Sequence, residues 1–306
     1  MAAPCTRKLE HPDYPTALRR LPQPPPILHV RGRVELLERT AIAVVGTRAH
    51  SVYGRDATVA FVVGLVRAGY AIVSGLARGI DSIAHRTALE VGGDTVAVLG
   101  TGIDVPYPPE HEELFRAIAE RGCLVSEFPP GTPPHKWHFP RRNRIIAGLA
   151  RGVLVVEAPE KSGALITAHY ALDEGKEVFA VPGPIHNRSS CGPNRLIQDG
   201  AALVTSAADI LRVLESRTGE PLPEPLAVGS DTLDLEEVHP EPAASELARR
   251  IWTALATGAM DLEVLATDLG AEPAALSVAL LELELSGLIE KLPGPRYERV
   301  RARLRR

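Results

Sequence analysis

A basic and aromatic stretch, HKWHFPRRNRIIAGL, occupies residues 135–149. The segment between Glu127 and Glu157 contains no acid but holds five cations, Lys136, Arg141, Arg142, Arg144 and Arg151, with Trp137 and Phe139 among them. Arginine forks match phosphate oxygens and aromatic rings stack on bases, so this pattern is typical of a groove for single-stranded nucleic acid. The alternative is that both rings belong to the core and the arginines form a solvated face.

Three loops rich in glycine and hydroxyl residues follow predicted strands. They contain Gly46, Thr47 and Arg48 in the first loop, Ser74, Gly75, Gly79 and Asp81 in the second, and Lys161, Ser162, Gly163 and Thr167 in the third. Helix N-termini at the carboxyl ends of parallel strands present free N–H groups, so these loops favour phosphate binding. None is a GxGxxG with an acid about 20 positions later, and no Walker A sequence occurs, so we expect no nucleotide cofactor. The alternative is that these glycines only make tight turns.

The histidines and carboxylates support a metal site or a hydrolytic site less strongly than the basic stretch and the loops support phosphate binding. His135 and His138 have HxxH spacing, but no third ligand falls at a recognisable distance and no HExxH occurs, so we expect no metal. No GxSxG nucleophile elbow is present. Asp81, His85 and Glu127 form a conceivable hydrolytic set, although a helix N-cap for Asp81 and ordinary burial for the other two are the simpler interpretation.

The elements that must position these residues alternate regularly between residues 41 and 216. Short runs rich in Val and Ile predict strands at 41–45, 71–74, 95–99, 123–128, 152–157, 177–181 and 202–205. Helices are predicted between them at 54–68, 81–91, 109–121, 143–150, 165–174, 193–198 and 208–215. Strict alternation indicates an α/β fold with a doubly wound, mainly parallel sheet of the Rossmann-like type. Such a sheet would bring Arg48, Arg78 and the basic stretch to one edge.

Length and composition are those of a soluble globular protein of about two domains, with 306 residues, 45% hydrophobic residues and a net charge of −4. We expect an extended lead-in at 1–40 that packs on a Rossmann-like domain at 41–218, and a linker at 219–242 with seven acids and no Lys or Arg. Three widely spaced cysteines predict no disulfide framework. Neither a signal-peptide core nor an apolar run of about 20 residues occurs, so we expect a cytoplasmic location.

The last segment, 243–306, is predicted to be a winged-helix-like domain. Helices at 244–255, 262–269 and 273–285 precede two strands at 288–292 and 296–300. A winged helix that reads duplex DNA normally carries Lys or Arg on its recognition helix, but none occurs from Ile251 to Glu290. We therefore favour protein contact or a structural role for this domain over duplex binding, which would be weak or confined to this domain.

Five runs, in this order and spacing, resemble the bacterial DNA processing protein A (DprA/Smf) family. They are AVVGTRAHSVYG, SGLARGIDSIAH, FPRRNRIIAGL, SGALITAHYALDEGKEVFAVPG and GPNRLIQDGA. The resemblance covers about residues 14–216, and the winged-helix-like tail is similar to the family's C-terminal module. It implies a protein that is not an enzyme, binds single-stranded DNA, protects incoming strands during natural transformation and loads the RecA recombinase. It also implies a homodimer formed through the Rossmann-like domain.

Carried onto this chain, the resemblance implies a DNA-binding site at the strand ends already described. The implied residues are Arg48, Ser74, Gly75, Gly79, Phe139, Arg141, Arg142, Asn143, Arg144, Ser162, Gly163 and Thr167. Two other functions stay open. One is a Rossmann-like enzyme that hydrolyses a nucleoside monophosphate, although the PGGxGTxxE motif of such enzymes is missing. The other is a regulator that reads duplex DNA through the winged helix.

Overall fold

The computed structural model describes residues 5–218, 223, 245–255, 260–286, 288–292 and 294–299. The chain divides into two compact units, Met1–Val228 and Gly229–Arg306, and each is described by itself. The expected linker at 219–242 lies outside the described residues except for Pro223. The boundaries of the four sequence segments therefore stay a prediction.

The described part of the first unit is built on one sheet with the strand order β1-β2-β6-β5-β4-β3-β7-β8-β9. The strands are β1 (Cys5–Lys8), β2 (Ile27–Gly32), β3 (Ala41–Val45), β4 (Ala71–Ser74), β5 (Thr95–Val98), β6 (Cys123–Ser126), β7 (Gly152–Val155), β8 (Glu177–Ala180) and β9 (Ala202–Leu203). Neighbours from β6 to β9 pair in parallel, whereas β2 pairs antiparallel with both β6 and β1. The expected doubly wound, mainly parallel sheet is confirmed.

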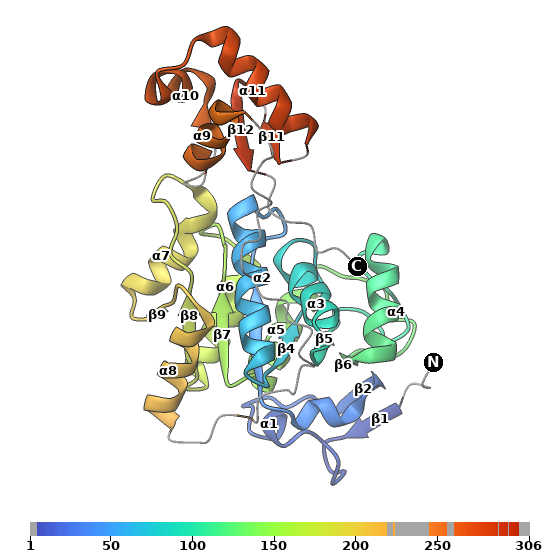
Figure 1. Ribbon diagram of the computed structural model, residues 1–306. Coiled ribbons are helices and arrows are strands. Elements are labelled where there is room, and N and C mark those ends of the chain that lie inside the picture. Colours follow the sequence, from blue (N-terminus) through green and yellow to red (C-terminus); the bar gives the residue numbers. More distant parts are fainter. Residues whose placement is uncertain are drawn as a thin grey trace. The chain divides into compact units, whose positions relative to one another are not determined.

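Helices cover both faces of this sheet (Figure 1). They are α1 (Thr16–Arg19), α2 (Val52–Arg67), α3 (Ile80–Glu90), α4 (Glu112–Arg121), α5 (His138–Leu149), α6 (Gly163–Asp173), α7 (Cys191–Gln198) and α8 (Ala207–Thr218), with short 3-10 turns at Val34–Glu38, Pro109–His111 and Arg188–Ser190. Successive residues of a strand point to opposite faces. Ile42 and Val44 of β3 accordingly join the core under α2, α3 and α8, while Ala43 and Val45 join the core under α5 and α6. Both cores are apolar, so the sheet is buried on both sides.

The chain reverses direction across the sheet at β3. Strands β4, β5 and β6 follow on one side of β3, and then β7, β8 and β9 follow on the other. The loops after β3 and β7 therefore diverge to opposite faces and leave a crevice between them. In open α/β sheets, ligands bind at such a switch point beyond the carboxyl ends of the strands.

The N-terminal segment contributes more regular structure than the sequence indicates. Strand β2 extends the sheet beyond β6, with Val30 opposite Val125, and β1 forms the outer edge. The short helix α1 packs Leu18 into the core beneath α5. Five prolines between residues 15 and 26 conceal these elements in the sequence.

The described part of the second unit contains three helices and a small sheet, as the winged-helix-like prediction requires. Its elements are α9 (Glu246–Ala254), β10 (Met260–Asp261), α10 (Leu262–Leu269), α11 (Pro273–Leu285), β11 (Ile289–Leu292) and β12 (Arg296–Arg299). Strand β12 pairs with both β10 and β11, and the helices enclose a core around Trp252 and Leu276. The last expected strand residue, Val300, lies outside the described residues. Helix α11 leaves Val278, Leu281 and Leu285 exposed.

None of the described helices is by itself long and apolar enough to cross a membrane. Only α10 and α11, which are bent by 113° relative to each other, meet the length and composition criteria when they are taken as a pair.

Candidate nucleic-acid interface

A cavity of about 950 Å³ opens beyond the carboxyl ends of β3 and β7, at the switch point of the sheet. Its walls come from the loops after β3 and β4, from the segment around the start of α5, from the start of α6 and from the loop after β8. Segments that are far apart in the sequence therefore meet here, as the alternation of strands and helices predicts.

The charge of the cavity lining favours an anion. Five basic side chains line it, Arg48, Lys136, Arg142, Lys161 and Arg188, against two acidic ones, Asp81 and Glu160. All the basic residues except Arg142 are exposed to solvent. A concave surface with an excess of exposed cationic side chains attracts phosphate groups, and the attraction weakens as salt screens it.

An aromatic ring stands among these cations at the cavity wall. The Phe139 ring lies 5.3 Å from the ring of Tyr107, measured between centroids. The guanidinium carbons of Arg48 and Arg142 each lie 5.7 Å from the centroid of the Phe139 ring. Phe139 lines the cavity and is only partly buried, so the sequence alternative in which it is a core residue is wrong.

Arg142 and Asp81 form a buried charged floor beneath this ring. Arg142 donates hydrogen bonds to the carbonyl oxygens of Gly75 and Val98, while Asp81 accepts from the backbone N–H groups of Gly75 (3.1 Å) and Ala77 (3.4 Å). Burial lowers the pKa of Arg142 to about 10, and the neighbouring Asp81 charge opposes that shift. Burial likewise raises the pKa of Asp81, with Arg142 opposing. These two groups hold the β4 loop and α5 together.

The loop after β4 has its expected glycines because the backbone is crowded there. A Cβ on Gly75 would lie 2.2 Å from Nη2 of Arg142, and Gly79 has φ of 75° directly before α3. Ser74 is fully buried and donates its hydroxyl to the Val44 carbonyl at 2.7 Å. These three expected residues shape the loop. Of them only Gly75 reaches a hollow at the rim, which it shares with Arg48 and Phe139.

Helix α6 begins at the opposite wall with its N–H groups near the cavity. The Ser162 hydroxyl caps the helix by accepting from the Ala164 N–H at 3.3 Å. Asn143 donates its side-chain N–H to the Gly163 carbonyl at 3.1 Å, which ties α5 to the first residue of α6. Ser162, Gly163, Asn143 and the buried Thr167 all line the cavity, as expected.

Arg141 and Arg144 are not part of the cavity lining. Both reach the carboxylate of Glu127, Arg144 at 2.6 Å and Arg141 at 3.0 Å. The side chain of Glu127 is 2% exposed and that of Arg144 is 11% exposed. An ionised carboxylate at that depth requires a cation beside it, so Arg144 has a structural partner that the sequence pattern does not reveal.

The lining also contains residues that the expected site did not include, among them Tyr107, Lys136, Lys161 and Arg188. Lys161 immediately precedes the expected Ser162, and Arg188 lies in the loop after β8. Examination of the loop after every strand, including the sixth predicted strand, would have found Arg188. Tyr107 lies in a long loop between β5 and α4, for which the sequence carries no comparable signal.

The conceivable hydrolytic set is not assembled by the structure. Asp81 lines the cavity, whereas the fully buried His85 lies 2.7 Å from the Thr95 hydroxyl and Glu127 pairs with Arg144. Asp81 is not a helix N-cap either, because it lies in the first turn of α3 and Gly79 precedes that helix. Within the described part of the chain, no three His, Cys, Asp or Glu side chains gather where a metal ion could be held.

A Rossmann-like domain with a cationic cavity at its switch point, followed by a winged helix, defines a class of ligand-binding α/β proteins. The family model described as DNA recombination-mediator protein A matches residues 6–215, and the model described as DprA winged helix domain matches residues 236–295. Protein Smf of Escherichia coli is 43% identical over 291 residues, covering 94% of this chain and 75% of that protein. DNA processing protein DprA of Streptococcus pneumoniae is 48% identical over 202 residues, covering 66% of this chain and 71% of that protein.

Solved structures agree with this match. The crystal structure of the Streptococcus pneumoniae DNA processing protein A has a TM-score of 0.66 at 46% identity, covering 68% of this chain and 73% of that one. A Helicobacter pylori DNA processing protein A, described for its single-stranded DNA binding mode, has a TM-score of 0.63 at 30% identity, covering 69% and 96%. The chain belongs to the DprA/Smf family of DNA recombination-mediator proteins.

Proposed function

We propose that the chain binds single-stranded DNA in the cavity at the switch point of its sheet. The observation that carries the proposal is the cavity lining itself, where exposed Arg48, Lys136, Lys161 and Arg188 line the same cavity as the ring of Phe139. Charges that follow a phosphate backbone and a ring that meets a base are the two requirements of a single-strand site. The Helicobacter pylori relative that shares the fold is described as binding single-stranded DNA.

The expected site residues divide into two groups under this proposal. Arg48 holds a phosphate, the Ser162 hydroxyl and the Gly163 N–H hold another, and Phe139 packs against a nucleotide. The other group shapes the cavity walls through the contacts described above and comprises Arg142, Asn143, Ser74, Gly75 and Gly79. Thr167 lines the cavity as a buried residue. Arg141, which is exposed, continues the positive surface beyond the cavity, and Arg144 supports it through Glu127.

The cellular role follows from the family. We propose that the chain acts in the cytoplasm, protects incoming single strands during natural transformation and loads RecA onto them. Two copies would associate through the Rossmann-like domain and bind one strand across two cavities. A RecA ATPase assay on strands coated with single-strand-binding protein, with and without this chain, tests the loading step directly.

We further propose that the chain is a binding protein and not an enzyme. The competing function is hydrolysis of a nucleoside monophosphate, for which the cavity is large enough. Asp81 is the buried acid at the cavity, but its hydrogen bonds go to the Gly75 and Ala77 backbone rather than toward open space. Incubation with nucleoside monophosphates distinguishes the two functions, because only the enzyme would release a free base.

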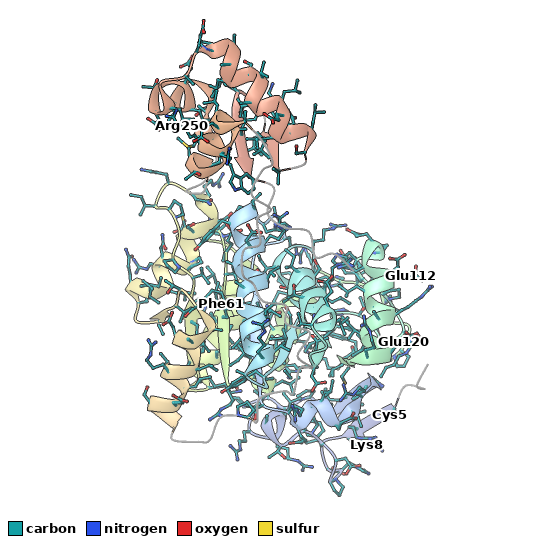
Figure 2. All side chains as sticks on the ribbon, in the orientation of Figure 1. Cys5, Lys8, Phe61, Glu112, Glu120 and Arg250 are labelled. Atoms are coloured by element: carbon teal, nitrogen blue, oxygen red, sulfur yellow. The ribbon has the colours of Figure 1, made fainter. Side chains whose placement is uncertain are left out.

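Fluorescence anisotropy of a labelled oligo-dT, and of its duplex, over a series of salt concentrations tests DNA binding. Wild type should prefer the single strand, with a log–log salt slope of roughly −0.7 per phosphate contact. Arg48→Ala should bind about tenfold more weakly and with a slope smaller by about 0.7, because one phosphate contact is lost. The control is Arg116→Ala, which removes the same charge from α4, where the exposed Arg116 pairs with Glu112. Figure 2 labels Glu112 on that helix.

Two results would contradict the proposal. If wild type does not bind the single strand, or binds it with no salt dependence, the electrostatic mechanism is ruled out. Equal weakening by Arg48→Ala and Arg116→Ala would mean that net charge matters and the cavity does not.

A further inference from the structure

Trp137 presents its ring to solvent beside the cavity. Its side chain is 67% exposed, and it belongs to none of the buried clusters formed by the described residues. Lys136, directly before it, and Phe139, two residues after it, both line the cavity, whereas Trp137 does not. The indole therefore does not line the cavity, but these two residues that flank it in the sequence belong to the cavity wall.

The backbone that carries this ring is fixed in place. His138, the first residue of α5, stacks on Phe128 with 4.1 Å between ring centroids, and its Nδ1 lies 3.2 Å from the Gly100 carbonyl oxygen. The His135 ring lies 5.4 Å from that of His138 and closes the turn. Residues on both sides of Trp137 are thus anchored, so its exposure results from a defined turn that points the indole outward.

A cation accompanies the exposed ring. The Lys136 ammonium lies 5.2 Å from the centroid of the indole ring and also lines the cavity. A large exposed indole is unusual because its burial would be favourable. An exposed ring paired with a cation offers a face on which a base can stack and a charge for the adjoining phosphate. Phe139 differs in its position, since it lies in the cavity wall beside Tyr107 and two guanidinium groups.

We propose that Trp137 and Lys136 form a second nucleotide subsite, in which the indole stacks on a base of the strand that leaves the cavity. This inference rests on the proposed single-strand binding and extends it by one position outside the cavity. Every base has a flat face, so the subsite takes any nucleobase and adds affinity without sequence preference. Duplex DNA cannot use it, because its bases are already stacked on one another.

The chain's composition makes this subsite directly observable. It contains only two tryptophans, and the other, Trp252, is 7% exposed in the core of the second unit. The emission of wild type minus that of Trp137→Phe isolates the exposed indole without disturbing the core. Oligo-dT titrated into both proteins should quench the isolated Trp137 emission, and the titration midpoint should coincide with that of anisotropy on the same samples.

Substitution gives the second readout. Trp137→Ala should bind oligo-dT about tenfold more weakly, which is typical of one lost stacking contact, while Trp137→Phe should retain most of the affinity. The salt slope should not change in either variant, because no phosphate contact is removed. Arg48→Ala is the complementary control, since it should lower the slope and still allow the indole to be quenched at saturation.

The possible failures are distinct. If oligo-dT binds with its normal salt slope but leaves Trp137 emission unchanged, and Trp137→Ala binds as wild type does, the subsite is refuted while the cavity stands. If no oligonucleotide binds at all, both proposals fall together. If Trp137 emission changes with protein concentration in the absence of DNA, a second copy of the chain covers the ring and the subsite is again refuted.

Discussion

Acid should destabilise the fold through His85, a residue that the first unit buries completely. Its Nδ1 lies 2.7 Å from the Thr95 hydroxyl, which itself donates to the Ile72 carbonyl at 3.0 Å. Because the threonine proton is used, the histidine must donate from Nδ1, and no described residue forms a hydrogen bond with the buried Nε2. A proton on Nε2 would have no acceptor there, so the neutral ring is favoured. Burial first, and then the charges of Arg142 and His111, lower its pKa to about 3.

The sign and size of the effect follow from these values. The pKa in the folded state is below the unfolded value of 6.5, so below pH 6.5 the unfolded chain binds a proton that the folded chain rejects. The stabilisation is complete above pH 6.5 and is lost progressively as the pH falls toward about 3. Between pH 8 and pH 5 the loss is RT ln(1 + 10^1.5), or about 2 kcal/mol. The raised pKa of Asp81 acts in the opposite direction, because protonation of that carboxyl favours the folded state.

Urea unfolding followed by far-ultraviolet circular dichroism at pH 8 and pH 5 measures the effect. His85→Gln keeps a side-chain N–H for Thr95 but cannot take up a proton. From pH 8 to pH 5, wild type should lose about 2 kcal/mol more unfolding free energy than the variant, whatever the variant's starting stability. All other titrating groups are shared, so they cancel in this difference. An equal loss in the two proteins would refute the assignment of a neutral, buried His85.

Two further pairs of substitutions probe the interior of the first unit. Gly75→Ala should lower the unfolding free energy by about 1–3 kcal/mol, because the new Cβ would overlap Arg142. In Gly163→Ala the new Cβ meets open space, so its unfolding free energy should stay within about 0.5 kcal/mol of wild type. Calorimetry compares the two variants, and equal losses would contradict the crowding argument. Arg144→Met should lower the unfolding free energy by about 3 kcal/mol, because it leaves buried Glu127 without its closest cation. Adding Glu127→Gln should recover most of that loss. A double variant that is as unstable in urea as the single one would show that the charge of Glu127 is not the cause.

The sequence predicts the parallel part of the fold well because buried parallel strands are short, apolar and separated by helices. All seven predicted strands are present, although several end earlier than predicted, as β6 does at Ser126. The last apolar residues of those runs, such as Val156, Val181 and Val204, lie just past the strand ends and are buried in the core. Strand β2 was missed because it pairs antiparallel and follows a proline-rich segment, although Leu28 and Val30 alternate with more exposed neighbours as a strand requires.

The site is predicted less completely, since a basic run does not reveal which way each side chain points. Helix α5 begins at His138, five residues earlier than predicted, because Pro140 is tolerated in a first turn. Within the helix, residues three apart share a face, so Arg141 and Arg144 both point to Glu127 while Arg142 turns to the floor of the cavity. Only the three-dimensional position of Glu127 separates these roles.

The central place of β3 also determines when a growing chain can acquire its cavity. Strand β3 must pair with β7, which joins Ile42 to Gly152, and Arg188 of the cavity wall lies farther along the chain. Contacts between residues so distant in sequence form late, because a long loop must close before they contribute. A nascent polypeptide still on the ribosome at residue 150 would have β3 to β6 available but no second cavity wall. The cavity, and with it the DNA binding proposed above, would therefore be complete only near the end of synthesis of the first unit.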